Sequence, residues 1–324
     1  MKLAALAAAK MVARQGRALL VAGLVIGIVF PGLSRAMMPA VAPLIVVLLF
    51  LAALRIGPAG MTPRGQGGAL RRSFGLMLAM QLALPLAALA LLAPLGALGG
   101  VLAAGVVLVL AAPPLTGSPG LAALSGADPG VALRQLVIST AFLPLTALPV
   151  LFLLPLPGAP ETRAAGEMLA ASLGMAGRLV VMIALAAGGA WLVRRRVPAL
   201  GAPDAPAVID AGLALTMGLV VIGLMSAVGP ALMAGDPALF AGIALSFLIC
   251  FGLQIATFRL MAQSEDDPAS LAILAGNRNL AIFLAAVPPD SAAALMLFVG
   301  CYQVPMYLTP LFAPWLYRRG RGIG

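Results

Sequence analysis

The chain has 324 residues, of which 62% are hydrophobic and 9% are charged, and its mean hydropathy is +1.10. Soluble domains are roughly 45–50% apolar and about 25% charged, so this composition excludes a soluble domain and predicts an integral membrane protein. The net charge of +10 comes from Lys and Arg at the ends of apolar runs with few aromatic residues between them, which argues against a nucleic-acid-binding surface.

Ten apolar runs approach the ~20 residues that a membrane-crossing helix needs. A tight turn at Ser34-Arg35 is expected to join the first two runs. The sequence therefore predicts an all-α fold with ten transmembrane helices. In chain order the runs cover residues 16–34, 36–54, 73–94, 99–125, 131–156, 170–193, 208–229, 238–260, 271–288 and 292–317.

The distribution of basic residues predicts the orientation of these helices. With a cytoplasmic N-terminus, sixteen Lys and Arg residues lie on the cytoplasmic side and three, Arg35, Arg163 and Arg178, lie on the outer side. The positive-inside rule then predicts that both termini are cytoplasmic in a bacterial-type inner (plasma) membrane. The sixteen are Lys2, Lys10, Arg14, Arg17, Arg55, Arg64, Arg71, Arg72, Arg134, Arg194, Arg195, Arg196, Arg259, Arg318, Arg319 and Arg321.

Ten runs also divide into two halves of five, covering residues 1–157 and 158–324. The first half starts inside and the second starts outside, so the halves are predicted to be inverted repeats. Secondary transporters commonly have inverted repeats, and their substrates bind near the midplane, where interrupted helices meet.

The fourth run is interrupted by three prolines and two glycines between Ala111 and Gly120. Each proline removes a backbone donor and clashes with the preceding turn, so a continuous helix is not expected. In lipid, such a break is tolerated only beside a cavity or buried protein. Thr116 and Ser118 place hydroxyl groups at the break, which predicts a functional site; a plain proline kink is the alternative.

The ninth run, the fourth of the second half, is interrupted by Gly276, Asn277, Arg278 and Asn279. An arginine at the centre of a span costs at least ~2.5–3.5 kcal/mol, and no acidic residue lies at similar depth in any predicted span. We therefore predict that Arg278 binds a substrate anion together with the two asparagines and the hydroxyl groups of the fourth run. The alternative is that Arg278 caps the carbonyl ends of the broken helices.

Other polar residues in the runs are weaker candidates. Gln81 in the third run either bonds a neighbouring helix or lines the site, as do Gln254 and Gln303. Ser139 and Thr140 in the fifth run either bond back to their own helix or face the site.

The remaining composition argues against an enzyme, a metal site or a cofactor. The chain has no histidine, and its two cysteines, Cys250 and Cys301, lie inside apolar runs. No nucleophile–base pair or carboxylate is predicted within a span, so the sequence offers no candidate catalytic residues. The acidic residues expected in solvated loops are Asp128, Asp236, Glu265, Asp266, Asp267 and Asp290.

Together these segments resemble the bile acid:sodium symporter family. The run from Gln81 to Pro85 is similar to the family's Gln-Phe-x-x-Met-Pro in helix 3, and the run from Pro113 to Pro119 is similar to its Pro-Gly-Gly-Thr-x-Ser-Asn in helix 4. Gly276-Asn277-Arg278-Asn279 is similar to Gly-Met-Gln-Asn in helix 9. The resemblance implies crossing interrupted helices 4 and 9. It also implies a core domain of helices 3–5 and 8–10, and a panel domain of helices 1, 2, 6 and 7.

In that family these positions bind two sodium ions beside a groove for an organic anion. The resemblance therefore implies two ion sites in this chain. One site would contain Thr116, Ser118 and Ser139 or Thr140, and the other would contain Gln81 and the backbone near Ala275 and Asn277.

Three departures argue against conventional coupling to two sodium ions. The family's helix 9 glutamate falls on Leu274, its helix 4 asparagine on Pro119, and its helix 9 glutamine on Arg278. A sodium ion prefers oxygen ligands with negative charge nearby. Two like charges ~4 Å apart at an effective dielectric of ~20 repel by roughly 4 kcal/mol. We therefore expect the guanidinium of Arg278 to stand in for a bound cation.

The sequence thus predicts a secondary transporter of a small organic anion that works by alternating access. One alternative is a metalloid efflux protein that resembles the arsenite carriers, although this chain lacks their helix 4 cysteine and helix 9 glutamate. A membrane sensor or scaffold that transports nothing is the other alternative.

Overall fold

The computed structural model describes residues 2–61, 67–158, 164–202 and 204–317. Within these ranges the chain is helical and forms no β-strand. Among these described residues, six helices are long and apolar enough to cross a membrane, and the number of such spans rises to eight if each of two bent helix pairs counts as one. This is the architecture of an all-α membrane protein.

Contacts divide the chain into two compact units. The first contains Met1–Thr62 and Val181–Leu239, and the second contains Pro63–Val180 and Phe240–Gly324. Two long helices, α10 (Ala165–Arg196) and α13 (Pro237–Leu260), run from one unit into the other.

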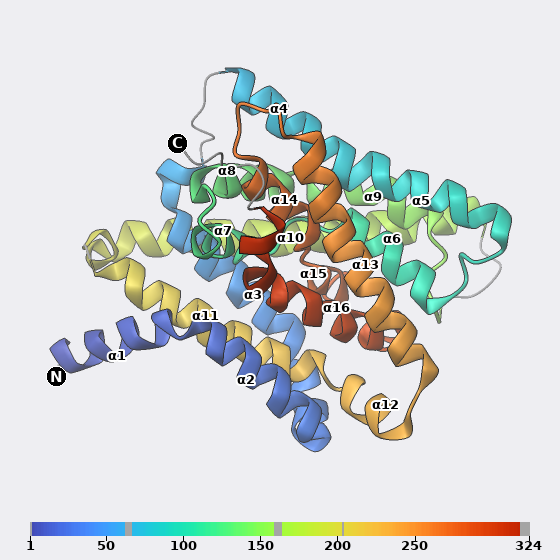
Figure 1. Cartoon of the computed structure of the whole chain (residues 1–324), viewed down its shortest axis with the longest axis horizontal. Helices are drawn as coiled ribbons and strands as arrows, with labels where there is room; N and C mark the ends of the chain where they lie inside the picture. The colour runs from blue at the N-terminus through green and yellow to red at the C-terminus, as the bar shows by residue number, and fades with distance from the viewer. Residues whose placement is uncertain (1, 62–66, 159–163, 203, 318–324) are drawn as a thin grey trace. The chain divides into compact units, whose positions relative to one another are not determined.

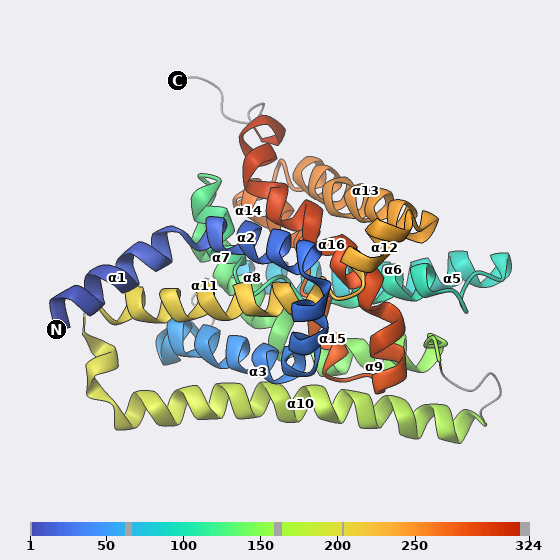
Figure 2. The ribbon, with the colours of Figure 1, turned by 90° about the horizontal axis from the view of Figure 1, so that it is seen from below.

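The first unit is a bundle in which α11 packs against α3 on one side and against α1 and α2 on the other (Figure 2). Glycines allow α2 and α11 to approach closely. A Cβ atom on Gly23 would lie 2.8 Å from the carbonyl oxygen of Gly218, and one on Gly27 would lie 2.7 Å from the Cβ of Met225. Small residues at such contacts are typical of helix packing in membranes. The helices of this unit, besides the second half of α10, are α1 (Lys2–Arg14), α2 (Gly16–Val29), α3 (Pro31–Met61), a 3₁₀ turn (Pro198–Gly201), α11 (Ala205–Leu224) and α12 (Val228–Ala234).

Charged side chains join the helix ends of the first unit. Arg55, near the end of α3, pairs with Asp210 of α11 at 2.7 Å. Arg194, at the end of α10, donates two hydrogen bonds of 2.9 and 2.6 Å to the carbonyl of Leu54. These three helix ends therefore lie together, as expected for ends on the same side of a membrane.

The second unit contains the segments that the sequence singled out. In Figure 1 its first helices, α4 and α5, form one extended rod joined by a π-helical turn. Besides the first half of α10 and most of α13, its helices are α4 (Gly67–Leu78), the π-helical turn (Ala79–Ala83), α5 (Leu84–Leu92), a 3₁₀ turn (Ala93–Leu95), α6 (Val101–Ala111), α7 (Ser118–Leu124), α8 (Pro129–Ala141), α9 (Leu143–Leu153), α14 (Pro268–Gly276), α15 (Ala281–Leu284) and α16 (Pro289–Leu316).

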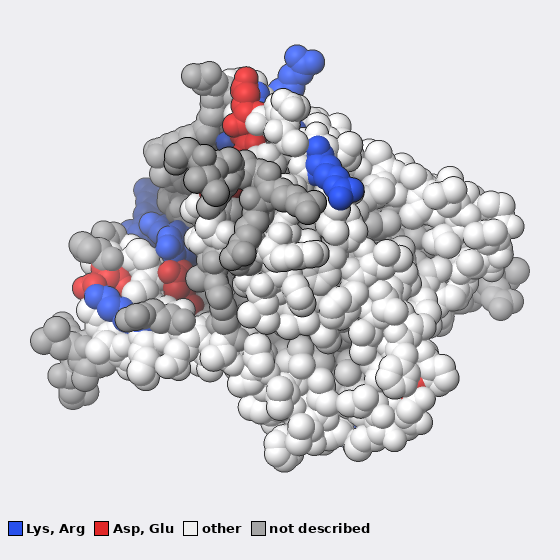
Figure 3. All heavy atoms as spheres, viewed as in Figure 1, with Lys and Arg blue, Asp and Glu red and all other residues white. Residues whose placement is uncertain are grey.

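Much of the second unit's surface is apolar. Figure 3 shows uncharged atoms along α5 and most of α13, while the visible charged side chains of this unit gather near one end of α4. The exposed side chains include Leu91, Leu145, Leu248, Leu311 and Trp315, each at least two-thirds exposed. A surface with few charges and many exposed apolar side chains fits contact with lipid.

The predicted first turn is misplaced, and one predicted run is bent. The first turn lies at Phe30 rather than at Ser34-Arg35, because α3 begins at Pro31 and a residue that precedes proline is disfavoured in a helix. Ser34 instead lies in α3, where its hydroxyl donates to the carbonyl of Gly27 at 2.6 Å. The fifth run is bent by 56° at Phe142, between α8 and α9.

Part of the orientation prediction lies outside the described residues. This applies to Arg64, Arg163, Arg318, Arg319 and Arg321.

Candidate functional site

Both predicted interruptions are present, and they meet. Residues 112–117 separate α6 from α7, and residues 277–280 separate α14 from α15. The two irregular segments pair in an antiparallel β-bridge between Pro114 and Arg278. The fourth run is therefore a broken helix and not a helix with a simple kink.

Two backbone hydrogen bonds hold this crossing together. The Leu115 amide donates to the carbonyl of Asn277 at 2.7 Å, and the Asn279 amide donates to the carbonyl of Pro113 at 2.8 Å. Backbone groups freed from a helix need partners in an apolar environment. Each broken helix supplies such partners for the other.

The Arg278 side chain lies at the centre of the crossing and is 1% exposed. Its Nε donates to the carbonyl of Ala275 at 2.9 Å, and its Nη1 donates to the carbonyl of Ala112 at 2.8 Å. Hydrogen bonds to a charged group contribute about 1.5–3 kcal/mol each. Two of them offset the ~2.5–3.5 kcal/mol that a central arginine costs in a bilayer. The guanidinium therefore caps the carbonyl ends of α14 and α6, as the alternative interpretation of Arg278 proposes.

The third nitrogen of Arg278 is different. Among the described residues, Nη2 is buried and has no hydrogen-bond partner, and none of the ion pairs in this part of the chain includes Arg278. Leaving a buried charged donor unsatisfied costs more than the ~1–3 kcal/mol of a neutral group. Such a group calls for a ligand or an ordered water.

Two other carbonyls at the end of α14 also have partners. The Tyr302 hydroxyl donates to the carbonyl of Gly276 at 2.6 Å. The carbonyl of Ile273 accepts the Asn277 amide at 2.9 Å and the Asn277 side-chain amide at 2.7 Å. Because the last carbonyls of a helix have no partner within the helix, these contacts stabilise α14 where it ends.

A hydrogen-bonded chain of side chains reaches the crossing from α13 and α16. Tyr317 donates to Gln254 Oε1 at 2.7 Å, Gln254 Nε2 donates to Thr309 at 3.1 Å, and Thr309 donates to Asn277 Oδ1 at 3.1 Å. Both polar groups of the Asn277 side chain are therefore already bonded. Asn277 orients the break and has little capacity left for a ligand.

The sequence analysis missed Tyr302 and Thr309, which lie on α16. The two residues are seven positions apart, so they share one helix face at a distance of two turns. This spacing of two polar groups within an apolar run could have identified both residues from the sequence.

Gly276 allows the broken helix to approach α13. A Cβ atom at this position would lie 2.2 Å from the carbonyl oxygen of Cys250 and 2.5 Å from the Cγ of Gln254. A non-glycine residue would therefore force the two helices apart.

The predicted hydroxyl groups of the fourth run lie at the crossing. Asn279 donates a long hydrogen bond of 3.5 Å to the hydroxyl of Thr116, and both residues are partly exposed. Ser118 is fully buried, and its hydroxyl has no hydrogen-bond partner among the described residues. These groups can interact with a small polar ligand.

Gln81 lies in the π-helical turn, which the sequence analysis did not predict. Gln81 is fully buried, and its Nε2 donates to the carbonyl of Ser139 at 3.2 Å. The Ser139 hydroxyl accepts a bond from Gln135 at 3.3 Å, and Thr140 is half-buried on the same helix. The resemblance assigned Gln81 and Ser139 to different ion sites, but here one hydrogen bond joins them.

Proline explains the π-helical turn. Pro85 has no amide proton to donate to the carbonyl of Gln81, four residues earlier. The Leu84 amide bonds to the carbonyl of Ala79, five residues earlier, which is the π-helical pattern. π-helical turns occur frequently at functional sites.

Two aspartates predicted in solvated loops join the starts of α8 and α14. The Asp128 side chain is exposed, as predicted, whereas that of Asp267 is half-buried. Asp128 and Asp267 each cap one of these helices, and the Asp128 amide donates to Asp267 Oδ2 at 2.9 Å. The Ser270 hydroxyl donates to the same oxygen at 2.7 Å. Burial favours a higher pKa for the Asp267 carboxyl, but these hydrogen bonds outweigh it, and the pKa lies below its ordinary value.

The neighbouring acidic residue is also misassigned as a solvated loop charge. Asp266 is 8% exposed and pairs with Arg134 at 2.5 Å and with Arg72 at 3.3 Å. Arg134 also donates to Ser73 at 2.9 Å. The loop before α14 is therefore attached to α4 and α8.

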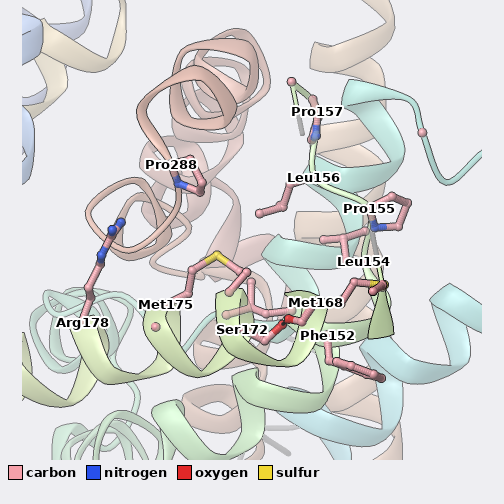
Figure 4. Close-up of a pocket in the computed structure, with 16 residues that line it drawn as sticks. Phe152, Leu154, Pro155, Leu156, Pro157, Met168, Ser172, Met175, Arg178 and Pro288 are labelled. Carbon is pink, nitrogen blue, oxygen red and sulfur yellow. Dashed lines mark hydrogen bonds between the residues drawn. The ribbon is translucent and has the colours of Figure 1, made fainter. Parts of the chain in front are cut away.

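A cavity of about 880 Å³ lies elsewhere in the second unit (Figure 4). Its described lining is mostly apolar, with Leu154, Met168 and Met175 among its residues. The one charged residue of that lining, Arg178, donates a hydrogen bond to the carbonyl of Ala286 at 3.1 Å. No residue of the crossing is in this lining. The crossing is the candidate site because it holds a buried guanidinium nitrogen with no hydrogen-bond partner among the described residues.

No protein-family model and no curated protein matches the chain. The resemblance to the bile acid:sodium symporters therefore depends on the short motifs in the third, fourth, fifth and ninth apolar runs.

Proposed function

We propose that this chain is a secondary transporter of a small organic anion and a divergent member of the bile acid:sodium symporter family. The observation that carries the proposal is the buried Nη2 of Arg278, which has no partner among the described residues and lies where two interrupted helices cross. A guanidinium nitrogen in such a position favours a carboxylate or another oxyanion. Intramembrane charges at broken helices are typical of substrate sites.

The polar groups of the two interrupted segments suggest how the anion binds. Nη2 donates to one oxygen of the anion. Asn279 and Thr116 share only a long hydrogen bond with each other, so they can turn towards a ligand, and the Ser118 hydroxyl supplies a further donor. Asn277 positions the break, because both of its side-chain polar groups are already bonded.

The proposed architecture has ten spans in two inverted five-helix repeats, with both termini cytoplasmic in an inner membrane. Two observations support it: the interruptions fall in the fourth and ninth runs, and the basic ends of α3 and α10 lie together. The two compact units support a panel formed by the first, second, sixth and seventh apolar runs and a core formed by the third to fifth and eighth to tenth runs. One part differs: α10 contains the sixth run, but its first half belongs with the core. Alternating access would move one unit against the other.

We propose that transport is not coupled to two sodium ions. The carbonyl of Ala275, assigned to an ion by the resemblance, accepts a hydrogen bond from Arg278. The carbonyl of Asn277 accepts one from Leu115. These oxygens already have donors in place of a cation.

The first experiment is a thermal-shift screen of mono- and dicarboxylates, sulfonates and phosphate against the detergent-solubilised protein. At least one anion should raise the melting temperature of the wild type and not that of Arg278→Gln. Arg178→Gln is the matched control, because Arg178 also donates to a backbone carbonyl but is exposed and lies outside the crossing. If every anion acts equally on the wild type and Arg278→Gln, the proposed anion site is wrong.

The second experiment measures flux of the selected anion into proteoliposomes. Saturable, protein-dependent flux is expected. Binding without flux would favour the sensor or scaffold. Arsenite flux that is lost in Cys250→Ser would instead favour the metalloid carrier, because Cys250 is the buried thiol that hydrogen-bonds Gln254 beside the crossing.

A further inference from the structure

We infer that Arg278 is a built-in counter-ion that occupies a monovalent-cation position between two half-helices, so that transport needs no co-transported cation. The part of this inference that concerns transport rests on the proposed function. The part that concerns the cation position concerns the folded protein alone and is tested separately.

The geometry of the two bonded carbonyls is the first step. Ala112 is the C-cap of α6, and Ala275 lies in the last turn of α14. Both carbonyl oxygens accept hydrogen bonds from the guanidinium, at 2.8 and 2.9 Å. Carbonyl oxygens of this kind are also the ligands that hard cations prefer.

The charge at this position is the second step. Each helix C-terminus carries the equivalent of about −0.5 elementary charge. Two such ends sum to roughly one negative charge, which one guanidinium neutralises. Among the described residues, no carboxylate forms an ion pair with Arg278. The helix ends themselves are therefore its counter-charge.

The covalent attachment is the third step. A free cation at this position could enter and leave with each transport cycle, but a side chain cannot. A further cation at ~4 Å would be repelled by the guanidinium. The site is therefore charge-balanced before any substrate binds. Nη2, which has no hydrogen-bond partner among the described residues, is the nitrogen left for a substrate anion.

Removal of the side chain should turn this position into a cation site. The test compares the melting temperatures of the wild type, Arg278→Ala and Arg178→Ala in detergent. The buffer contains choline chloride, to which a low concentration of guanidinium, sodium or potassium chloride is added. Arg278→Ala should melt below the wild type, and guanidinium or a small metal cation should raise its melting temperature in a saturable way. The wild type and Arg178→Ala should show no such rise.

If Arg278→Ala does not fold, Arg278→Gln replaces it, because a glutamine amide can donate to one of the two carbonyls and leaves the other open. A folded variant that responds to no small cation more than to choline overturns the cation position. Saturable stabilisation of Arg178→Ala would also overturn it, since the effect would not be specific to the crossing.

The transport experiment uses proteoliposomes and the anion identified in the thermal-shift screen. Equal initial rates in sodium, potassium and choline media are expected for the wild type, and a requirement for a small cation is expected for the Arg278 variant. A steep sodium dependence of the wild type overturns the inference. A cation-responsive variant combined with a wild type that transports no anion would refute the proposed function and leave the cation position intact.

Discussion

The Nη1 atom of Arg278 donates a hydrogen bond of 2.8 Å to the carbonyl oxygen of Ala112, 166 positions earlier in the chain. This bond joins the segments that follow α6 and α14, two helices far apart in the chain. A guanidinium in an apolar bundle would ordinarily be unfavourable. Here the charge stabilises the crossing because the helix breaks leave carbonyl groups without partners.

Tyr302→Phe should destabilise the crossing without changing its shape. The hydroxyl of Tyr302 is the donor to the carbonyl of Gly276, at 2.6 Å. Loss of that donor leaves a buried carbonyl unsatisfied and should cost about 1–3 kcal/mol. Thermal or chemical unfolding in detergent measures the change. Tyr307→Phe on the same helix serves as the control, and an equal loss in both variants would contradict a specific role for Tyr302.

Gly276→Ala should prevent the close approach of α14 to α13. The added methyl group would lie 2.2 Å from the carbonyl oxygen of Cys250, which is backbone and cannot rotate away. A loss of about 3 kcal/mol or more is expected. Gly252→Ala is the matched control on α13, because a Cβ atom there meets nothing within 4 Å. The yield of monodisperse protein and the melting temperature distinguish the two, and a stable Gly276→Ala protein would show that the helices can separate.

Pro85→Ala should lower the rate of anion flux without lowering the melting temperature. The new amide can donate to the carbonyl of Gln81, so that the π-helical turn relaxes to α-helix and rotates Gln81 away from Ser139. We expect an unchanged or higher melting temperature with a lower rate of anion flux. Pro149→Ala in α9 makes the same substitution in a helix without a π-helical turn and should retain flux. Full activity of Pro85→Ala would show that the turn is not needed for transport.

The stability contributed by Asp267 should depend on pH. Its pKa in the folded protein lies below the ordinary 3.8, so its carboxylate contributes stability above about pH 3.8. That contribution is lost as the pH falls through the lowered folded-state pKa. The melting temperature of the wild type should therefore exceed that of Asp267→Asn near pH 7, and the difference should shrink below pH 4. A constant difference from pH 7 to pH 3 would contradict this assignment.

The breaks in the helices could be predicted from the chain because their causes are local. Pro113 and Pro114 remove backbone donors wherever they lie, and consecutive polar residues from Asn277 to Asn279 disfavour a lipid-facing helix. The π-helical turn has an equally local cause in Pro85, but it was not predicted, since a proline near the middle of a span more commonly produces a kink.

The partners of the polar residues could not be predicted. Asp266 and Asp267 read as solvated loop charges, yet Arg134 and the Asp128 amide bind them from segments more than 130 residues away. Tyr302 and Thr309 read as ordinary residues of an apolar run until α16 lies beside the end of α14. Such contacts depend on which helix faces which, and a single run of residues does not encode that choice.

The order of residues alone was enough to show a membrane-embedded helical protein with two breaks and an arginine within an apolar run, because hydropathy and proline chemistry act within a few residues of the chain. Only the tertiary structure decided which nitrogens of Arg278 are hydrogen-bonded. Nε and Nη1 donate to carbonyls at the ends of α14 and α6, and Nη2 has no partner among the described residues. Hydrogen bonds are short and directional, so this division required the two helix ends to be brought together in space.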